Sequence, residues 1–445
     1  MQDHYIQSMV PDYKGLEWQG HGLALPTKIS HWQSQEAVDL EQHEIVAYKA
    51  RQASHAWRWP KRDIAVFTDL HADGHAFVNS LIASGYIKKF GPDDSDFTLT
   101  KKGRKCHFII NGDCFDKGPS NLNLLRLMHQ LREQKANLKI IAGNHDIRFL
   151  VGLSALNNQD NPLYSHLFIR MAPKGVSFFK EIYDTYIAHL CEEERLALGE
   201  GLDETAIRDH LYPDANWPEN FRIHAKGQIK DAKIEKEIED VQKKQKRFES
   251  QCAKFELSLP MAFAAINYWK KLFLEKNGEF SWFYRKMKLL HTSGSFLFVH
   301  AGIDDVMARK LKNKGAKALN RKFHQALKKD LFKLYYGHMG NMFRTKYRLS
   351  DHDFTKSGAK TLKNAGYYAI VQGHCNRHKG QELVNRYGLL NFECDASLDE
   401  QTRLKEGLVG RGAATTLIRS SGAVLGISVD YPFVKAYTPH LGIKQ

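Results

Sequence analysis

The chain has 445 residues, of which 42% are hydrophobic and 26% are charged. This is the composition of a folded globular protein, and it excludes a wholly disordered chain. The mean hydropathy of −0.48 and the lack of any apolar run of about 20 residues exclude a membrane-spanning segment. Lys and Arg outnumber Asp and Glu by 65 to 50, which favours acidic partners without identifying one.

The six cysteines are scattered and form no CxxC pair, so we expect reduced thiols and a cytoplasmic or otherwise reducing compartment. The start of the chain lacks a basic region followed by an apolar core, so we expect no signal peptide. Residues 1–60 are polar and aromatic, and we predict an irregular arm that packs on the core. Its tryptophans are Trp18, Trp32, Trp57 and Trp59.

From residue 61, short apolar runs alternate with amphipathic stretches. The apolar runs are 63–67, 106–110 and 138–141, and helical patterns lie between them around 77–82 and 122–131. This order is typical of a parallel sheet with helical crossovers. Ligands of such sheets bind at the carboxyl ends of the strands.

Residues 151–289 are charged and mostly helical in pattern, and we interpret them as an insertion into the core. Apolar residues recur every three or four positions over 234–259, which predicts one long amphipathic helix ended by Pro260. A second helix should follow, so that 228–275 form a helical hairpin. A solvated face is one explanation of its basic cluster, and a docking site for a partner protein or an anionic membrane is another. The cluster consists of Lys243, Lys244, Lys246 and Arg247.

Strand patterns return after the insertion, at 295–299, 367–371, 388–392, 414–418 and 423–429. We therefore predict one catalytic core, made of 61–150 and 290–445, that carries the helical insertion.

Polar side chains with metal-binding chemistry follow five of the predicted strands. Oxygen ligands mixed with imidazole nitrogens suit Mn, Fe or Zn. Single residues of this kind are often helix caps or structural histidines, but five in succession at strand ends predict a metal site. These residues are Asp69 with His71, Asp113, Asn144 with His145, His300, and His374.

In these blocks the sequence resembles the calcineurin-like metallophosphoesterases, and within them the PPP phosphatase branch. The family pattern GDxHG, GDxxDRG, GNHD or GNHE, and two separate histidines is matched in order. The corresponding blocks are Thr68-Asp-Leu-His-Ala72, Gly112-Asp-Cys-Phe-Asp-Lys-Gly118, Gly143-Asn-His-Asp146, Val299-His-Ala-Gly302 and Gln372-Gly-His374. The resemblance implies an α/β fold, an α/β/β/α sandwich, here with the mostly helical insertion.

The resemblance also implies roles for single residues. Asp69 and His71 would hold one divalent ion, Asp113 would bridge, and Asn144, His300 and His374 would hold a second, with Mn as the expected metal and Fe or Zn as alternatives. Phosphomonoester hydrolysis would proceed by direct attack of a metal-bridging hydroxide. His145 would be the general acid and Asp116 would orient it, because an imidazolium beside a carboxylate can donate a proton near neutral pH.

Three positions depart from the family pattern. Thr68 and Ala72 replace glycines, and Lys117 replaces the arginine of DRG. Lysine supplies charge without a planar bidentate grip, so we expect phosphate to be bound by Lys117 and Asn144 together with a further cation. Arg344 or Arg348 is the candidate for this cation. The alternative for each is an ordinary surface arginine with no role in binding phosphate.

The expected function is a phosphoprotein phosphatase acting on phosphorylated Ser, Thr or Tyr, with nucleic acid not expected as a partner. One alternative is a hydrolase similar to diadenosine tetraphosphatases. A non-enzyme alternative is a binding module that uses the basic hairpin. The insertion and the many lysines also resemble Wip-type effector phosphatases, which bacteria inject into host cells, and this would place the protein in a host cytosol.

Overall fold

The structure is a computed structural model that describes residues 2–19, 23–32, 34–35 and 57–439. It divides the chain into two compact units. The first unit comprises the described residues of 1–144, 287–321 and 341–445, and the second comprises 145–286 and 322–340. The rest of the predicted arm lies outside the described residues. Within them, Trp32 and Trp57 are buried and Trp18 is exposed.

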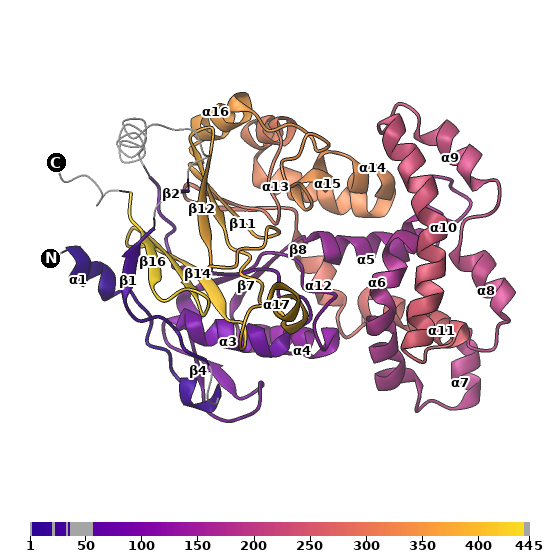
Figure 1. Cartoon of the computed structure of the whole chain (residues 1–445), viewed down its shortest axis with the longest axis horizontal. Helices are drawn as coiled ribbons and strands as arrows, with labels where there is room; N and C mark the ends of the chain where they lie inside the picture. The colour runs from indigo at the N-terminus through magenta and orange to yellow at the C-terminus, as the bar shows by residue number, and fades with distance from the viewer. Residues whose placement is uncertain (1, 20–22, 33, 36–56, 440–445) are drawn as a thin grey trace. The chain divides into compact units, whose positions relative to one another are not determined.

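The first unit contains a mixed sheet of eight described strands (Figure 1). Its centre is the apolar run of β3, which is buried along its whole length and pairs in parallel with β6, while β6 pairs in parallel with β7. β14 adds to the other side of β3 in antiparallel direction. In sheet order the strands are β1 (Ile29–His31), β16 (Val434–Tyr437), β15 (Ala423–Ser428), β14 (Ala414–Arg419), β3 (Ile64–Phe67), β6 (His107–Ile110), β7 (Asn137–Ile141) and β8 (Met287–Lys288).

A second sheet of six described strands faces the first. Apolar side chains of both sheets form one buried core, in which Ile64 and Ile109 of the first sheet meet Phe298 and Val371 of the second. Trp57 packs on Phe296, with ring centroids 5.5 Å apart. In sheet order the strands are β2 (Ser34–Gln35), β12 (Glu382–Arg386), β13 (Leu389–Glu393), β11 (Ala369–Gln372), β10 (Phe296–Phe298) and β9 (His291–Ser293). A small hairpin pairs β4 (Ile87–Lys89) with β5 (Phe97–Leu99).

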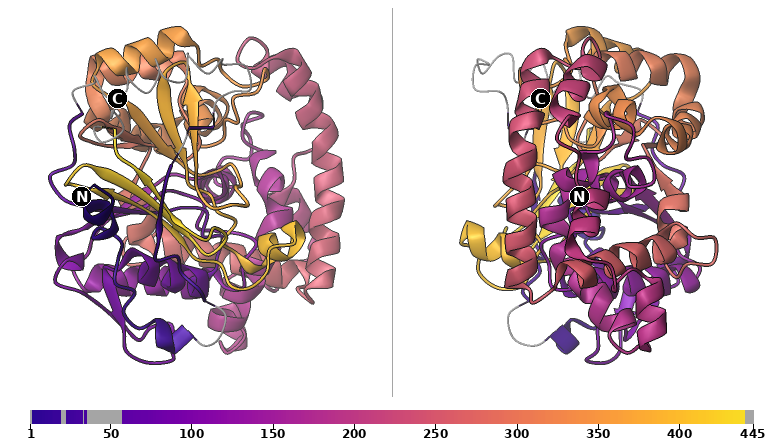
Figure 2. Two further views of the ribbon diagram at one scale, coloured as in Figure 1. Left: turned by 60° about the vertical axis from the view of Figure 1, so that its left-hand side comes forward. Right: turned by 90° about the vertical axis from the view of Figure 1, so that its right-hand side faces the viewer.

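Helices flank the two sheets of the first unit. α3 (Gly74–Ser84) and α4 (Asn121–Glu133) lie on the outer face of the eight-stranded sheet, and α16 (Lys356–Asn364) lies over the six-stranded sheet (Figures 1 and 2). Asp73 caps the start of α3 by accepting from the backbone N–H of Ala76, and Ser120 caps α4. The first part of α13 (Asp305–Lys329), α17 (Glu400–Glu406) and α1 (Gln2–Gln7) complete the unit. The predicted α/β sandwich is confirmed.

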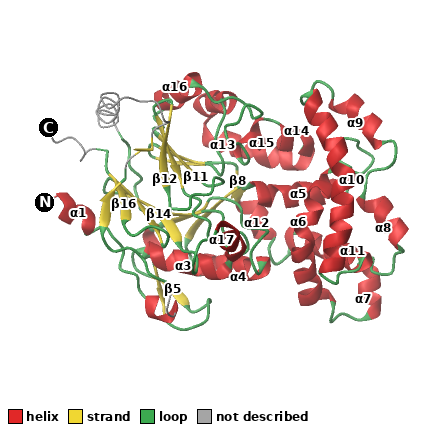
Figure 3. Ribbon diagram, in the orientation of Figure 1, coloured by secondary structure: helices red, strands yellow, loops and turns green. Residues whose placement is uncertain are grey.

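The second unit is built of helices and their loops (Figure 3). Its long helix α10 packs along α6, where the rings of Phe248 and Phe168 lie 5.8 Å apart, and α11 packs on α6 through Phe273 and Phe178, 6.0 Å apart. The helices that lie wholly in the unit are α6 (Leu167–Ile182), α7 (Glu192–Ala197), α8 (Glu204–Leu211), α9 (Trp217–Ala225), α10 (Asp231–Lys254), α11 (Leu259–Phe273), α12 (Ser281–Lys286) and α14 (Leu331–Tyr336).

The hairpin α10–α11 differs from the sequence prediction in three details. α10 ends at Lys254, and Pro260 lies in the first turn of α11, where its missing N–H costs nothing. Glu237, rather than the neighbouring Ile238, is buried, because Lys233 pairs with it at 2.8 Å. Lys244 is partly buried, so it does not belong to the exposed basic face.

None of the helices in the described part of the chain is both long enough and apolar enough to cross a bilayer.

Candidate active site

Five loops meet at one end of the sheets in the first unit. They follow β3, β6, β7, β10 and β11, the strands after which the sequence places polar residues with metal-binding chemistry. Several residues of these loops have left-handed backbone, which is uncommon for residues other than glycine and costs about 1–3 kcal/mol each. They are Asp69 (φ 53°), His71 (43°), Ala72 (61°), Asp113 (54°) and His374 (66°). Such strain persists only where the surrounding structure enforces it, and it gathers at functional sites.

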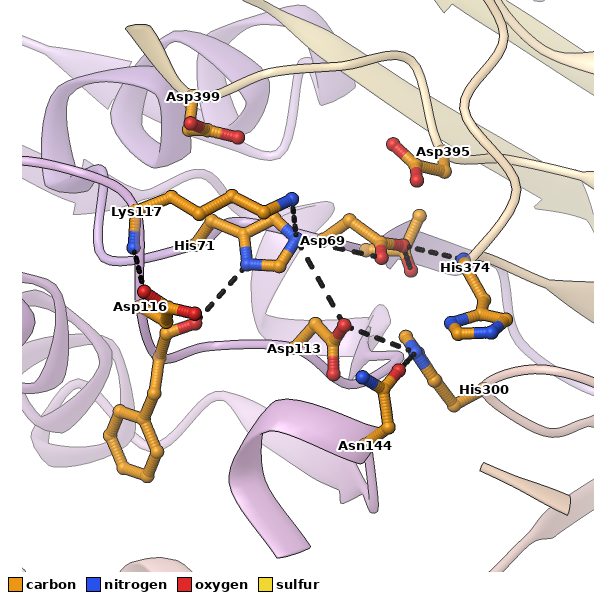
Figure 4. A network of polar contacts seen from close by, with 12 residues as sticks. Asp69, His71, Asp113, Asp116, Lys117, Asn144, His300, His374, Asp395 and Asp399 are labelled. Carbon is orange, nitrogen blue, oxygen red and sulfur yellow. Dashed lines mark hydrogen bonds and ion pairs between the residues drawn. The ribbon is translucent and has the colours of Figure 1, made fainter. Parts of the chain in front are cut away.

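Asp69, His71 and Asp113 converge in one half of this site (Figure 4). His71 Nε2 lies 4.0 Å from an oxygen of Asp69 and 3.9 Å from Oδ2 of Asp113. The hydroxyl of Thr68 donates to the other oxygen of Asp69 at 2.5 Å. The backbone N–H of His374 donates to the same oxygen at 3.0 Å, which leaves Oδ1 of Asp69 facing His71.

Asn144, His300 and His374 converge in the other half. His300 Nε2 lies 3.4 Å from Asp113 Oδ2 and 3.2 Å from Asn144 Oδ1. The carboxamide end of Asn144 also lies 2.8 Å from Nδ1 of His374. Potential ligand atoms of Asp113, His300 and His374 all lie within 4.8 Å of one another.

A single oxygen joins the two halves of the site. Asp113 Oδ2 approaches both His71 Nε2 and His300 Nε2. This is the position that a bridging carboxylate needs between two ions.

Backbone carbonyls orient all three histidines of the site. His71 Nδ1 lies 3.1 Å from the carbonyl of Phe115 and His300 Nδ1 lies 2.8 Å from that of Asn111. His374 Nε2 lies 3.2 Å from the carbonyl of Arg344. A carbonyl only accepts, so each of these nitrogens carries a proton, and in the neutral ring the opposite nitrogen directs a lone pair into the site.

The donor set therefore fits divalent metal ions. Three imidazole rings, two carboxylates and the carboxamide of Asn144 point toward one another, and positive charge would stabilise such a cluster of acceptors. Asp69 and His71 would hold one ion, and Asn144, His300 and His374 the other, with Asp113 shared between them.

The electrostatics of the site agree with this fit. Burial alone would lower the pKa of His300, but the carboxylates of Asp113 and Asp69 raise it to about 10. Burial raises the pKa of the Asp69 carboxyl, and His300 partly opposes that shift. Each group thus responds to the concentration of negative charge in a place with little solvent. The site attracts cations.

Glycines allow the loops to approach this closely. A Cβ on Gly373 would lie 2.0 Å from the Asp69 carboxylate, and one on Gly143 would lie 2.0 Å from the backbone nitrogen of Asp113. Neither position has room for a side chain. Where the sequence departs from the glycine pattern, Ala72 takes the left-handed conformation itself, and Thr68 contributes a hydrogen bond to Asp69.

Lys117 extends across the first half of the site. Its ammonium lies 2.9 Å from His71 Nε2 (Figure 4). Asp116 precedes it, and both have left-handed backbone, with φ of 72° and 78°. The Asp116 carboxylate accepts from the backbone N–H of Lys117 at 2.9 Å. The backbone N–H of Asp116 donates to the side-chain oxygen of Asn121, and the two hydrogen bonds fix the turn.

The remaining predicted residues fall in different places. His145 follows Asn144 directly in the first turn of α5 (Asn144–Ala155), is buried, and is the first residue of the second unit. Arg344 is partly exposed and reaches the site through its backbone carbonyl, whereas Arg348 is exposed. Asp73 caps α3.

Two carboxylates of the site were missed by the sequence reading. Asp395 and Asp399 lie in the loop between β13 and α17 and are 3% and 1% exposed. Burial, followed by the charge of Asp69, raises the pKa of Asp395 well above its ordinary value. The signal available in the sequence was the run Cys394-Asp-Ala-Ser-Leu-Asp399, which directly follows the apolar strand 388–392.

Comparison with known proteins adds a family to this geometry. Residues 62–244 match the family model described as calcineurin-like phosphoesterase. Among solved structures, the chain is similar to a cold-active protein tyrosine phosphatase of a psychrophilic Shewanella species, with 15% identity, coverage of 84% of this chain and 80% of that chain, and a TM-score of 0.43. It is also similar to a protein serine/threonine phosphatase from Saccharomyces cerevisiae, with 11% identity, coverage of 91% of each chain and a TM-score of 0.38.

No curated protein matches the sequence. The family match covers the loops after β3, β6 and β7, which carry Asp69, His71, Asp113 and Asn144. Residues 62–244 are therefore similar to a calcineurin-like phosphoesterase domain.

Proposed function

We propose that the protein is a phosphoprotein phosphatase that uses two divalent metal ions, with Mn expected, to hydrolyse phosphomonoesters of Ser, Thr or Tyr. The observation that carries the proposal is the position of Asp113 Oδ2, 3.9 Å from His71 Nε2 and 3.4 Å from His300 Nε2. One carboxylate oxygen shared by two histidine half-sites suits a dinuclear centre rather than a single ion.

The bound ions would polarise the phosphoryl group and lower the pKa of a water molecule. The protein's own residues do the rest. Thr68 and the N–H of His374 hold one oxygen of Asp69, so that the other faces His71. Lys117 brings an ammonium to the site and would neutralise charge on the phosphoryl oxygens. His145, the residue after Asn144, would protonate the leaving oxygen. The carboxylate of Asp116 would orient His145 and keep its imidazole ring protonated.

The phosphoprotein class is supported by the block Gly112–Gly118, which is similar to that of PPP phosphatases. The same ligands would also serve a dinucleotide hydrolase. The test must therefore compare substrates directly.

The test is phosphate release by the full-length chain after chelation and reconstitution with Mn²⁺. The panel holds phosphotyrosine, phosphoserine and phosphothreonine peptides, diadenosine tetraphosphate and a phosphodiester. We expect metal-dependent release from a peptide, loss of that release in Asp113→Asn, and normal release in the matched surface variant Asp353→Asn. Cleavage of the dinucleotide alone would replace the proposal with a nucleotide hydrolase. A folded, Mn-binding chain that cleaves no substrate would favour the binding module.

A further inference from the structure

Lys117 contacts His71, and its proposed role in binding phosphate does not explain this contact. His71 Nδ1 carries a proton, because it faces the carbonyl of Phe115 at 3.1 Å. His71 Nε2 is therefore an acceptor, and the ammonium of Lys117, 2.9 Å away, donates to it. Lys117 thus uses the one lone pair that the His71 ring offers.

A metal ion in the first half-site needs the same lone pair. Asp69 Oδ1 and Asp113 Oδ2 lie 4.0 and 3.9 Å from His71 Nε2, and these three atoms are the donors of that half-site. Since one lone pair serves one partner, the ammonium and the ion exclude each other at His71. An ion can bind there only if Lys117 moves.

Asp399 is a suitable acceptor for the displaced ammonium. Its Oδ1 accepts from the N–H of Thr402 at 2.9 Å and caps α17, which fixes the carboxylate in place. Its Oδ2 is buried and has no hydrogen-bond partner among the described residues. A buried carboxylate oxygen without a partner is costly, so an approaching donor gains free energy there.

Lys117 already lies within electrostatic range of this carboxylate. Burial raises the pKa of Asp399, and the ammonium of Lys117 is among the groups that oppose the rise. Among the described residues, the Lys117 ammonium and the Asp399 carboxylate form no ion pair within 4.0 Å, so Lys117 must move to contact Asp399. Figure 4 shows Asp399 on the side of Lys117 away from Asp113.

We propose that Lys117 has two positions: it donates to His71 when the first half-site holds no ion, and it moves to Asp399 when an ion binds. In the second position its ammonium would stay beside the site and face the phosphoryl group, a step that rests on the proposed function. Asp399 is then a positioning residue for Lys117.

The test is a Mn²⁺ titration of the chelated full-length chain by calorimetry at fixed pH, with Lys117→Met, Asp399→Asn and the double variant. Asparagine caps helices as well as aspartate, so α17 should persist in Asp399→Asn. We expect Lys117→Met to tighten one of the two sites, and Asp399→Asn to weaken the same site, each by at least about threefold. Lys405, an exposed residue of α17, supplies the control Lys405→Met, which should change neither site.

The double variant separates competition from simple charge. If Asp399 acts by receiving Lys117, its substitution should have no effect once Lys117 is methionine. If Asp399 only adds negative charge near the ion, Asp399→Asn will weaken Mn²⁺ binding equally in both backgrounds, and the proposal is overturned. Unchanged affinity in Lys117→Met would overturn it as well.

A kinetic readout gives a second check on the same variants. With a small aryl phosphate, Asp399→Asn should raise KM at saturating Mn²⁺ more than it lowers kcat, because the ammonium is present but badly placed; an unchanged KM would contradict the second position. Failure of the wild-type chain to bind two ions would contradict the proposed dinuclear centre. Two ions bound with equal affinity by every variant would contradict only the inference about Lys117.

Discussion

The side-chain amide of Asn111, at the end of β6, donates to the backbone carbonyl of Val299, 2.9 Å away at the end of β10. It also lies 3.3 Å from the carbonyl of Val371 on β11. One buried amide thereby joins the eight-stranded sheet to the six-stranded sheet. It does so at the end of the sandwich from which the ligand loops emerge, and the carbonyl of the same residue orients His300.

We expect Asn111→Leu to lower the free energy of unfolding by about 2–4 kcal/mol, because it removes the donor to two buried carbonyls. Urea denaturation of the chelated chain measures this effect without a contribution from bound metal. The exposed residue Asn123 supplies the control Asn123→Ala, which should stay within about 0.5 kcal/mol of the wild type. Equal stability of Asn111→Leu and the wild type would show that the sheets do not depend on this contact.

Asp113→Asn and His145→Asn should both abolish turnover, for different reasons. Asp113 is the shared ligand, so its substitution should weaken Mn²⁺ binding as well. His145→Asn should retain both ions, because the histidine acts on the leaving group. Calorimetry with Mn²⁺ separates the two cases, and the exposed His189 supplies the control His189→Asn. Loss of metal from both variants would refute the assigned division of roles.

Gly373→Ala should disable the first half-site. Its Cβ would lie 2.0 Å from both the Asp69 carboxylate and the Thr68 hydroxyl, so the carboxylate must move. We expect Mn²⁺ affinity to fall by about 10–100-fold, as for other changes next to metal ligands. Gly227→Ala is the comparison, since that glycine has left-handed backbone but open space around it. Gly227→Ala should cost about 1 kcal/mol of stability and leave metal affinity unchanged.

The stability of the fold should fall in mild acid through His291 of β9. Burial, with the charges of Lys288 and Lys139, lowers the pKa of His291 to about 4. The unfolded chain takes up a proton near pH 6.5 that the folded chain refuses, so the contribution of His291 is complete above pH 6.5 and is lost as pH falls toward 4. Between pH 7 and 4.5 the wild type should lose about 2 kcal/mol more than His291→Gln in urea denaturation. Parallel losses would contradict this account.

Much of the fold and the candidate site could be predicted from the sequence, because their signals are local. The apolar runs before Asp69, Asp113, Asn144, His300 and His374 correspond to β3, β6, β7, β10 and β11. The polar residues that follow stand out against those runs. The parallel strands and the set of residues gathered at one end follow from that pattern, whereas the sandwich was expected from the family resemblance.

The features that the sequence reading missed depend on partners distant in the chain. Glu237 is buried in α10 because Lys233 and Arg170 pair with it, and no periodic pattern of apolar residues includes such a position. In the sequence Asp399 looks like an ordinary helix cap, because Lys117 is far from it along the chain and only the fold brings the two residues near each other. The carbonyls that orient the histidines carry no sequence signal at all, since every residue has one.

That use of the main chain has a consequence for how the site tolerates mutation. The acceptors that fix the ring orientations belong to Phe115, Asn111 and Arg344, and no replacement of those side chains deletes a carbonyl oxygen. The three imidazoles are therefore insulated from most single amino-acid changes around them. The sensitive positions around them are those where the backbone has no room for a side chain, Gly143 and Gly373 above all. Apart from the ligands and His145, a mutational scan should therefore find its largest effects at residues that bear no functional group.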